Sequence, residues 1–207
     1  RAEQLLVSQQ SGWESLYDSD KGLLKAGWSN KENDFLGYHI DRKANESRLA
    51  PIWAVLVSEG RVPTAVFEDM LLITGSVELN GSTVNPMLTW DGSYFQAMLP
   101  ALWLDEARLI PDYQVVYDFS LVHAANADNY GIPFVSASAT IADGYAAYGL
   151  ESVSESYRKF GNAIETGTTG SPHTLALYYM TNEADALNRL KTSLKWILRI
   201  FKMILFI

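Results

Sequence analysis

Residues 88–100 read Leu88-Thr89-Trp90-Asp91-Gly92-Ser93-Tyr94-Phe95-Gln96-Ala97-Met98-Leu99-Pro100, which predicts a loop followed directly by a helix. Gly92 lets the backbone turn, Ser93 can cap the first turn of the helix, and apolar residues then recur at helical spacing. Asp91 precedes the helix N-terminus, where the helix dipole favours a carboxylate. A flat indole such as Trp90 beside a fixed carboxylate can hold a sugar ring. The alternative interpretation is an ordinary core tryptophan next to an ordinary cap.

The composition places this stretch in a globular protein. The chain has 207 residues, 48% hydrophobic and 19% charged, which suits one domain, or a large piece of one, with a substantial core. Its formal net charge of -8 argues against non-specific binding to nucleic acid. The absence of cysteine excludes disulfides, thiolate metal sites and a cysteine nucleophile. The chain begins at Arg1 without a signal-like apolar core, so we expect it to be processed or cut from something longer.

The region upstream of the loop mixes short helices with turns. A helix is expected over residues 2–9, and glycines next to aromatic residues at 12–13, 27–28 and 37–38 predict turns. Short strands are expected around Leu23–Trp28 and Leu36–Ile40.

A pair of helices is expected after these strands. Asn45 can cap the first of them, Pro51 either kinks its first turn or delays its start, and Gly60 ends it. Pro63 then opens a second helix through about Ile73, so that the two form a helical hairpin.

Three longer helices are expected in the second half of the chain. One runs from Pro111 to Tyr130 and stops at Gly131, one is opened by Ser171-Pro172, and one by Asn182. Helices alternate with long loops rich in Trp, Tyr, Gly, Asp and Ser, and strand-like alternation is scarce. The sequence therefore predicts a mainly α protein built from antiparallel helical hairpins, with its function on loops at one rim.

The C-terminal end differs from the rest of the chain. Four basic residues fall on one helical face, and apolar residues cover the remainder; the basic residues are Lys191, Lys195, Arg199 and Lys202. The segment is too short and too charged to span a bilayer. It could lie on a membrane surface, dock on a missing part of the domain, or be an artefact of assembly, and the last two are favoured. We therefore expect an incomplete domain over residues 1–192 and a basic amphipathic tail over 193–207.

Several runs, in the same order along the chain, resemble the bacterial glucoamylase-like family. They are Asn45 to Ala50 with Trp53 to Leu56, Val62-Pro63, Leu88 to Pro100 with Trp103 to Glu106, Gly131-Ile132-Pro133 with Ser136 to Ser138, Gly144-Tyr145 with Tyr148-Gly149, and Gly170 to His173 with Leu175 to Leu177. That family is an (α/α) toroid, related to β-1,2-glucan hydrolases and to the transglycosylase region of cyclic β-glucan synthases. The resemblance covers residues from about Gly12 to Leu190.

The resemblance implies a glycosidase or other glucan-acting domain, and a partial toroid, since about seven helices are expected against the twelve of a closed one. We expect a periplasmic or extracellular location, with a cytoplasmic one left open. Two positions depart from the transglycosylase branch, which carries a glutamate at the position of Gln96 and another at that of Ala137. Any chemistry that those glutamates perform there cannot occur here.

Glycoside hydrolysis uses two carboxyl groups, one as acid and one as base or nucleophile. Glu46 is the expected proton donor, because packing at a helix opening could desolvate it; pairing with Arg48 is the alternative. Asp91 is the expected base or acceptor for sugar hydroxyls. Other carboxylates on rim-like segments are Asp41 and Asp143. The residues expected to contact substrate are Trp90, Gln96, Asp41, Arg48 and Tyr145.

Other chemistry finds little support in the sequence. The three histidines are too scattered to suggest a metal centre, and no Walker or Rossmann glycine pattern is present, so neither metal nor cofactor is expected. No serine lies in a nucleophile-elbow context, which argues against a serine hydrolase. The favoured function is a glycoside hydrolase acting on glucan. The alternatives are a catalytically silent glycan-binding module and a helical scaffold for protein partners. If the protein is a hydrolase, we expect Trp90, Asp91, Glu46 and Tyr145 to converge on one concave rim.

Overall fold

The computed structural model describes residues 1–105, 108, 112–139, 144–164 and 169–205, with side chains up to residue 195. About 48% of it is helical and 15% is strand, so the protein is mainly α. Contacts between residues divide the chain into two compact units, Arg1–Ile73 and Thr74–Ile207. The expected division at residues 192 and 193 falls inside a continuous helix of the second unit. The toroid arrangement stays a prediction.

Unit 1 (Arg1–Ile73) combines three α-helices with short strands. Its elements are α1 (Ala2–Leu16), β1 (Tyr17–Asp18), β2 (Leu23–Lys25), β3 (Trp28–Ser29), β4 (Asp34–Phe35), β5 (His39–Ile40), the 3-10 helix η1 (Glu46–Arg48), α2 (Leu49–Val57) and α3 (Ala65–Glu68). The strands form a three-stranded antiparallel sheet in the order β1-β2-β5 and a β3-β4 hairpin. Its core gathers around four buried side chains, Leu24, Ala54, Val62 and Val66.

Two helices of unit 1 differ from the prediction in length. The first extends to Leu16, through Gly12 and Trp13, where a turn was expected. Polar and helix-forming neighbours outweigh the single glycine there, since one glycine in a helix costs only about 1 kcal/mol. The helix expected from Pro63 to Ile73 is limited to α3, and Leu71 instead pairs through its backbone with Asp41 and Lys43.

The helix opening at Asn45 is confirmed. The Asn45 side chain accepts a hydrogen bond of 2.8 Å from the Ser47 amide, and its own backbone is extended. The first turn is a 3-10 turn, and α2 begins at Leu49 with Pro51 in its first turn, where proline is tolerated. The α-helix thus begins three residues after the 3-10 turn opens at Glu46, and Pro51 lies within it without breaking it.

Unit 2 (Thr74–Ile207) contains five α-helices and two short hairpins among its described residues. Its elements are β6 (Val77–Leu79), β7 (Ser82–Val84), α4 (Tyr94–Met98), the 3-10 helix η2 (Leu99–Leu102), α6 (Gln114–Tyr130), β8 (Ser138–Ala139), β9 (Tyr145–Ala146), the 3-10 helix η3 (Glu151–Val153), α7 (Glu155–Phe160), α8 (His173–Tyr179) and α9 (Glu183–Leu205). The hairpins pair β6 with β7 and β8 with β9.

The central helix of unit 2 is α6, and its predicted end is confirmed. Gly131 follows it in a left-handed conformation with φ 66°, a conformation that glycine adopts readily at a helix C-terminus. Phe119 and His123 of α6 belong to an aromatic cluster, defined by Tyr94, Phe119, His123, Phe134 and Tyr178. These rings come from α4, α6, α8 and the loop after α6, so the cluster is the core that joins those elements.

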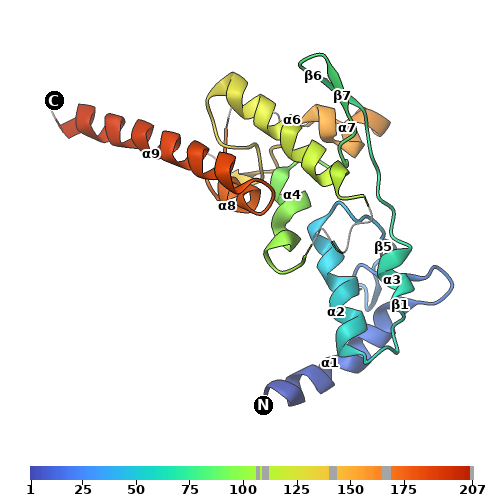
Figure 1. Ribbon diagram of the computed structural model, residues 1–207. Coiled ribbons are helices and arrows are strands. Elements are labelled where there is room, and N and C mark those ends of the chain that lie inside the picture. Colours follow the sequence, from blue (N-terminus) through green and yellow to red (C-terminus); the bar gives the residue numbers. More distant parts are fainter. Residues whose placement is uncertain (106–107, 109–111, 140–143, 165–168, 206–207) are drawn as a thin grey trace. The chain divides into compact units, whose positions relative to one another are not determined.

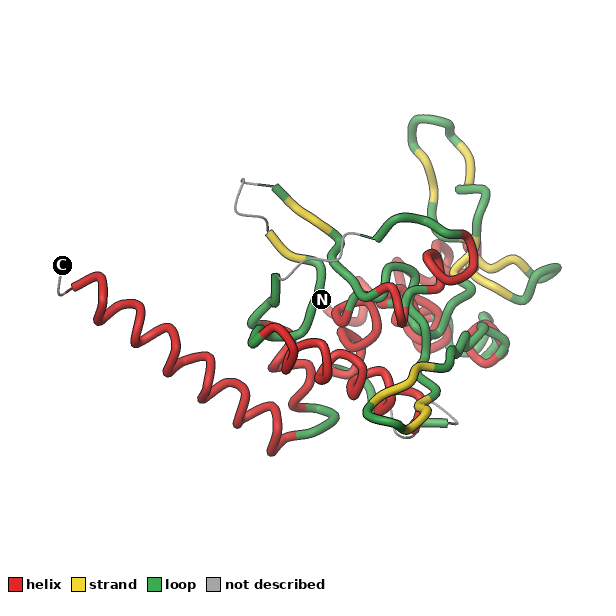
Figure 2. Tube along the Cα trace, turned by 90° about the horizontal axis from the view of Figure 1, so that it is seen from above, coloured by secondary structure: helices red, strands yellow, loops and turns green. Residues whose placement is uncertain are grey.

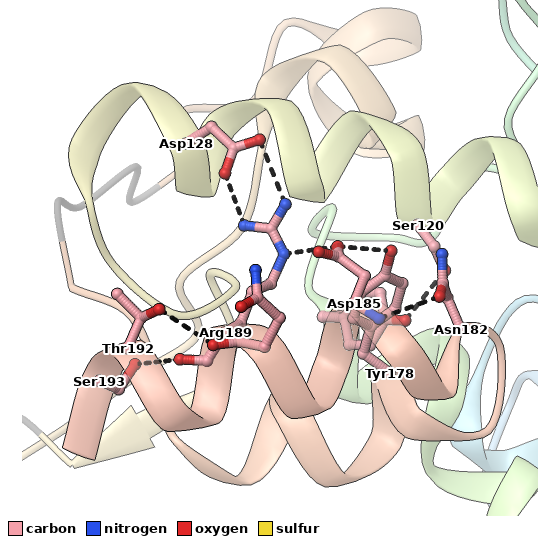
Figure 3. A network of polar contacts seen from close by, with 10 residues as sticks. Ser120, Asp128, Tyr178, Asn182, Asp185, Arg189, Thr192 and Ser193 are labelled. Atoms are coloured by element: carbon pink, nitrogen blue, oxygen red, sulfur yellow. Dashed lines mark hydrogen bonds and ion pairs between the residues drawn. The ribbon is translucent and has the colours of Figure 1, made fainter. Parts of the chain in front are cut away.

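The last helix is fixed to α6 and α8 through its first turns (Figure 3). Asn182 accepts a hydrogen bond from the Asp185 amide, which confirms the expected helix opening. Arg189 forms a bidentate ion pair with Asp128 of α6, at 2.7 and 3.2 Å, and its Nε donates to Asp185. Tyr178 of α8 also donates to Asp185. In both views the later turns of α9 extend away from the other elements of unit 2 (Figures 1 and 2).

Candidate functional site

The Trp90 loop (residues 88–93) is held from one side by the segment that forms η3 and α7. The Thr89 amide donates to the Val153 carbonyl at 3.1 Å, and the Thr89 carbonyl accepts from the Glu155 amide at 2.7 Å. The Trp90 carbonyl accepts from the Ser154 hydroxyl at 2.7 Å and the Ser156 amide at 3.1 Å. The backbone on both sides of the indole is therefore fixed.

Two glycines allow the loop and the segment before η3 to cross at close range. Gly92 has φ 73°, and its carbonyl accepts from the Leu150 amide at 3.1 Å. A Cβ atom on Gly92 would overlap the Leu150 backbone, and a Cβ atom on Gly149 would overlap the Asp91 carbonyl. Only glycine at both positions fits this crossing without a backbone shift.

The Trp90 indole is presented at the surface. Its side is supported by Phe160 at the end of α7, with ring centroids 5.8 Å apart and planes tilted by 43°. Trp90 is nevertheless 44% exposed, so it is neither a fully buried core residue nor an unsupported surface ring. A supported, exposed aromatic face is suited to stacking against an apolar face of a ligand.

Asp91 is half-buried and is held by Gln96. The Gln96 amide group donates to Asp91 Oδ2 at 3.3 Å, and its carbonyl oxygen accepts from the Asp91 backbone amide at 3.2 Å. Burial raises the pKa of Asp91, and the hydrogen bond from Gln96 opposes this rise. A carboxyl with a raised pKa beside an exposed indole can donate a proton, or accept from hydroxyl groups when ionised.

The expected cap of α4 is wrong. The Ser93 side chain makes no capping bond to its own helix; its hydroxyl instead accepts from the Ala137 amide at 3.2 Å and lies 3.3 Å from the Ser136 hydroxyl. The Phe95 amide at the helix opening donates to Ser136 Oγ at 3.0 Å. The first turn of α4 is thus capped by Ser136, which is distant in sequence. The hydrogen bonds of Ser93 and of the first residues of α4 fix the loop against residues 135–137.

Tyr145 belongs to strand β9 of unit 2, and its convergence with Trp90 and Asp91 stays a prediction. It is 74% exposed and lines an apolar pocket of about 430 Å³ with Phe95, Leu99, Leu102, Ala137, His173, Ala176 and Leu177. Burial lowers the pKa of His173 there. Among the described residues, no hydrogen bond, ion pair or ring contact joins Tyr145 to Trp90 or Asp91.

The other predicted site residues belong to unit 1. The Arg42 guanidinium pairs with the Asp41 carboxylate, and the buried Arg48 donates to the Asn45 carbonyl at 3.2 Å. Glu46 opens η1, and its Oε2 atom is buried without a hydrogen-bond partner among the described residues. Glu46 and Asp91 lie in different units, so their convergence stays a prediction. Asp143 lies outside the described residues.

The sequence interpretation missed the partners of the Trp90 loop. Ser154 caps α7 by accepting from the Tyr157 amide, and a serine followed by a helical pattern was the available signal. Glu155 is a buried carboxylate, 2% exposed, with Lys159 Nζ 3.7 Å away. Gly149 and Phe160 carry no local signal for their role, because each acts through a contact made only in the folded chain.

Within the described ranges, no three His, Cys, Asp or Glu side chains gather in a way that could hold a metal ion. No helix in the part of the chain that the structure describes is both long and apolar enough to cross a bilayer.

Comparison with known proteins adds no assignment: no family model and no curated protein matches this chain.

Proposed function

We propose that the protein binds a glucan at the Trp90 loop and hydrolyses it as a glycoside hydrolase. The observation that carries the proposal is the exposed Trp90 indole beside the half-buried, hydrogen-bonded Asp91 carboxyl. An indole can stack against the C–H face of a pyranose ring, while a neighbouring carboxyl and amide bond its hydroxyls. The loop is fixed by backbone hydrogen bonds, so little ordering is needed when a sugar binds.

In the proposed reaction Asp91 is one of two carboxyl groups. Its raised pKa favours the protonated form, which suits a general acid that donates to the leaving oxygen. The second carboxyl is Glu46, whose role is then that of base or nucleophile. This assignment reverses the one expected from sequence, and it requires the two carboxyl groups to lie within about 9.5 Å of each other.

A second candidate is a glycan-binding module without catalysis. It is favoured by the amide of Gln96, which occupies the position of a glutamate in the family that the sequence resembles and bonds the Asp91 carboxyl directly. Ala137, at the position of the other glutamate, contributes a backbone amide to the Ser93 hydroxyl and no carboxyl group. In this case Trp90, Asp91 and Gln96 bind sugar, and no bond is broken.

Titration calorimetry with β-1,2-gluco-oligosaccharides, together with release of reducing ends, tests both candidates. Trp90→Ala should weaken binding at least tenfold with little loss of thermal stability, as expected for an exposed stacking ring. Trp103→Ala is the matched control, because Trp103 is a 65% exposed indole of the same unit outside the loop. Asp91→Asn and Glu46→Gln should each abolish hydrolysis and retain binding.

The outcomes separate the two candidates. Binding without measurable release of reducing ends from the parent chain supports the binding module. If Trp90→Ala lowers the melting temperature strongly and leaves binding unchanged, Trp90 is structural and the proposed site is wrong.

A further inference from the structure

Helix α9 packs one of its faces on other elements of unit 2 and leaves another face without such contacts. Arg189 and Asp185 mark the packed face, because they bond Asp128 of α6 and Tyr178 of α8 (Figure 3). Ala186, which is 2% exposed, is buried on the same side. At about 100° per residue, Lys191 lies about 200° around the helix from Arg189 and so points away from these partners.

The outward face carries a stripe of exposed leucines. Leu187, Leu190 and Leu194 are three and four residues apart, which places them on one side of the helix. They are 38%, 40% and 50% exposed, respectively. A stripe of large apolar side chains in water at helical spacing indicates a surface that binds something.

Basic residues run beside this leucine stripe. Lys191 and Lys195 are exposed and four residues apart, and the sequence continues the basic spacing at Arg199 and Lys202. No acidic residue follows Asp185, whereas the whole chain has a net charge of -8. Positive charge is therefore concentrated on this helix in an otherwise acidic protein.

We propose that the outward face of α9 binds the surface of an anionic phospholipid membrane. A helix with leucines on one side and lysines beside them can bury the leucines at the headgroup boundary while the lysines contact acidic headgroups. Phe201 follows Leu194 by seven residues in the sequence, a spacing that continues the leucine stripe with another residue type found in such helices. A second copy is a poorer occupant, because it would bring the same lysines against each other. This inference is independent of the proposed glucan hydrolysis.

Flotation of the full chain with vesicles tests the proposal. The chain should float with vesicles that contain phosphatidylglycerol, remain free with phosphatidylcholine alone, and dissociate at about 1 M salt, where the Debye length is about 3 Å. Lys191→Gln with Lys195→Gln should weaken binding about 25-fold, at about fivefold per lysine. The matched control is Lys21→Gln with Lys31→Gln, which removes the same charge from exposed positions of unit 1 and should bind as the parent does.

Two more variants keep the test decisive. Leu190→Ser with Leu194→Ser should also reduce vesicle binding. A chain that ends at Thr192 should lose vesicle binding but retain the circular dichroism of a folded protein, because Arg189 and its partners remain. Equal binding to neutral and anionic vesicles, or unchanged binding after the lysine substitutions, would overturn the proposal. So would a parent chain that ignores vesicles but dimerises through the leucines, which would assign this face to a second copy.

Discussion

Asp91 and Gln96 hold each other through two hydrogen bonds, so the amide influences how the carboxyl titrates. Burial favours the neutral carboxyl, whereas the donated amide hydrogen favours the ionised one. The balance between these two effects decides whether Asp91 can act as an acid near neutral pH.

Replacement of Gln96 by leucine should therefore raise the pKa of Asp91 further. The substitution removes the bond that favours ionisation and leaves the carboxyl half-buried. Carbon-detected NMR titration of the side-chain carboxyl measures the change. Asp18 is an internal control, because His39 lowers its pKa in unit 1 and should continue to do so. A lower pKa of Asp91 in the variant would show that the amide does not stabilise its ionised form.

His123 makes stability depend on pH through the aromatic cluster. Burial lowers its pKa to about 3, with the Gly92 backbone opposing, so the folded protein holds the neutral imidazole. Between the unfolded pKa of about 6.5 and about 3, the unfolded chain binds the additional proton, so stability falls as pH falls. The loss attributable to His123 should be about 2 kcal/mol at pH 5 relative to pH 8.

Urea unfolding of the parent and of His123→Leu at several pH values isolates this contribution. Asp91 acts in the opposite direction, since a carboxyl with a raised folded pKa stabilises the protein as pH falls; the comparison with His123→Leu removes that effect. Parallel pH profiles of the two proteins would contradict the assignment to His123.

At the scale of elements, the Trp90 loop depends on the crossing of Gly92 and Gly149. Gly149→Ala should lower the free energy of unfolding by about 2–3 kcal/mol, since its methyl group would meet the Asp91 backbone and the chains would have to separate. Glycan binding should fall as well, because the loop moves.

Gly12→Ala is the matched control for Gly149→Ala. No atom lies within 4 Å of its added methyl group, and Gly12 lies inside α1, where alanine should stabilise the helix by about 0.5–1 kcal/mol. Chemical denaturation measures both variants. A Gly149→Ala protein as stable as the parent would show that the crossing is looser than the structure indicates.

Local sequence signals predicted some elements and not others. The Asn45 opening and the Gly131 stop depend on a residue and its immediate neighbours, so the sequence predicted both. Ser93 had the same local signal, yet its hydroxyl is engaged by residues 136 and 137, so tertiary contacts displaced the cap. The sequence singled out Asp91 and Gln96 as site residues, but it did not predict the hydrogen bonds between them. The Phe160 support and the Gly149 approach could not be predicted, because both depend on contacts made only in the folded chain.

At the scale of the whole molecule, the two proposed catalytic carboxyls belong to separate units. A piece consisting of residues 74–207 contains the Trp90 loop, all its partners and the aromatic cluster. We expect this piece to fold and to bind gluco-oligosaccharide within about threefold of the full chain, but to release no reducing ends without Glu46.

Calorimetry and a reducing-end assay on the full chain and on the piece measure these two properties, with a thermal melt to establish folding. The complementary piece, residues 1–73, should unfold without cooperativity, since α1 has no buried residue and its core is small. Hydrolysis by residues 74–207 alone would exclude Glu46 from the reaction.

The hydrogen bond from Ser154 to the Trp90 carbonyl spans 64 residues of the chain, which affects when the site can form. Contacts between residues so distant in sequence form slowly, because a long loop must close before they can stabilise anything. During synthesis, the Trp90 loop emerges from the ribosome well before the segment at Gly149–Ser156 that completes it. Until that segment arrives, the indole and its neighbours are exposed apolar surface in a nascent chain, a state in which chaperones bind and aggregation begins.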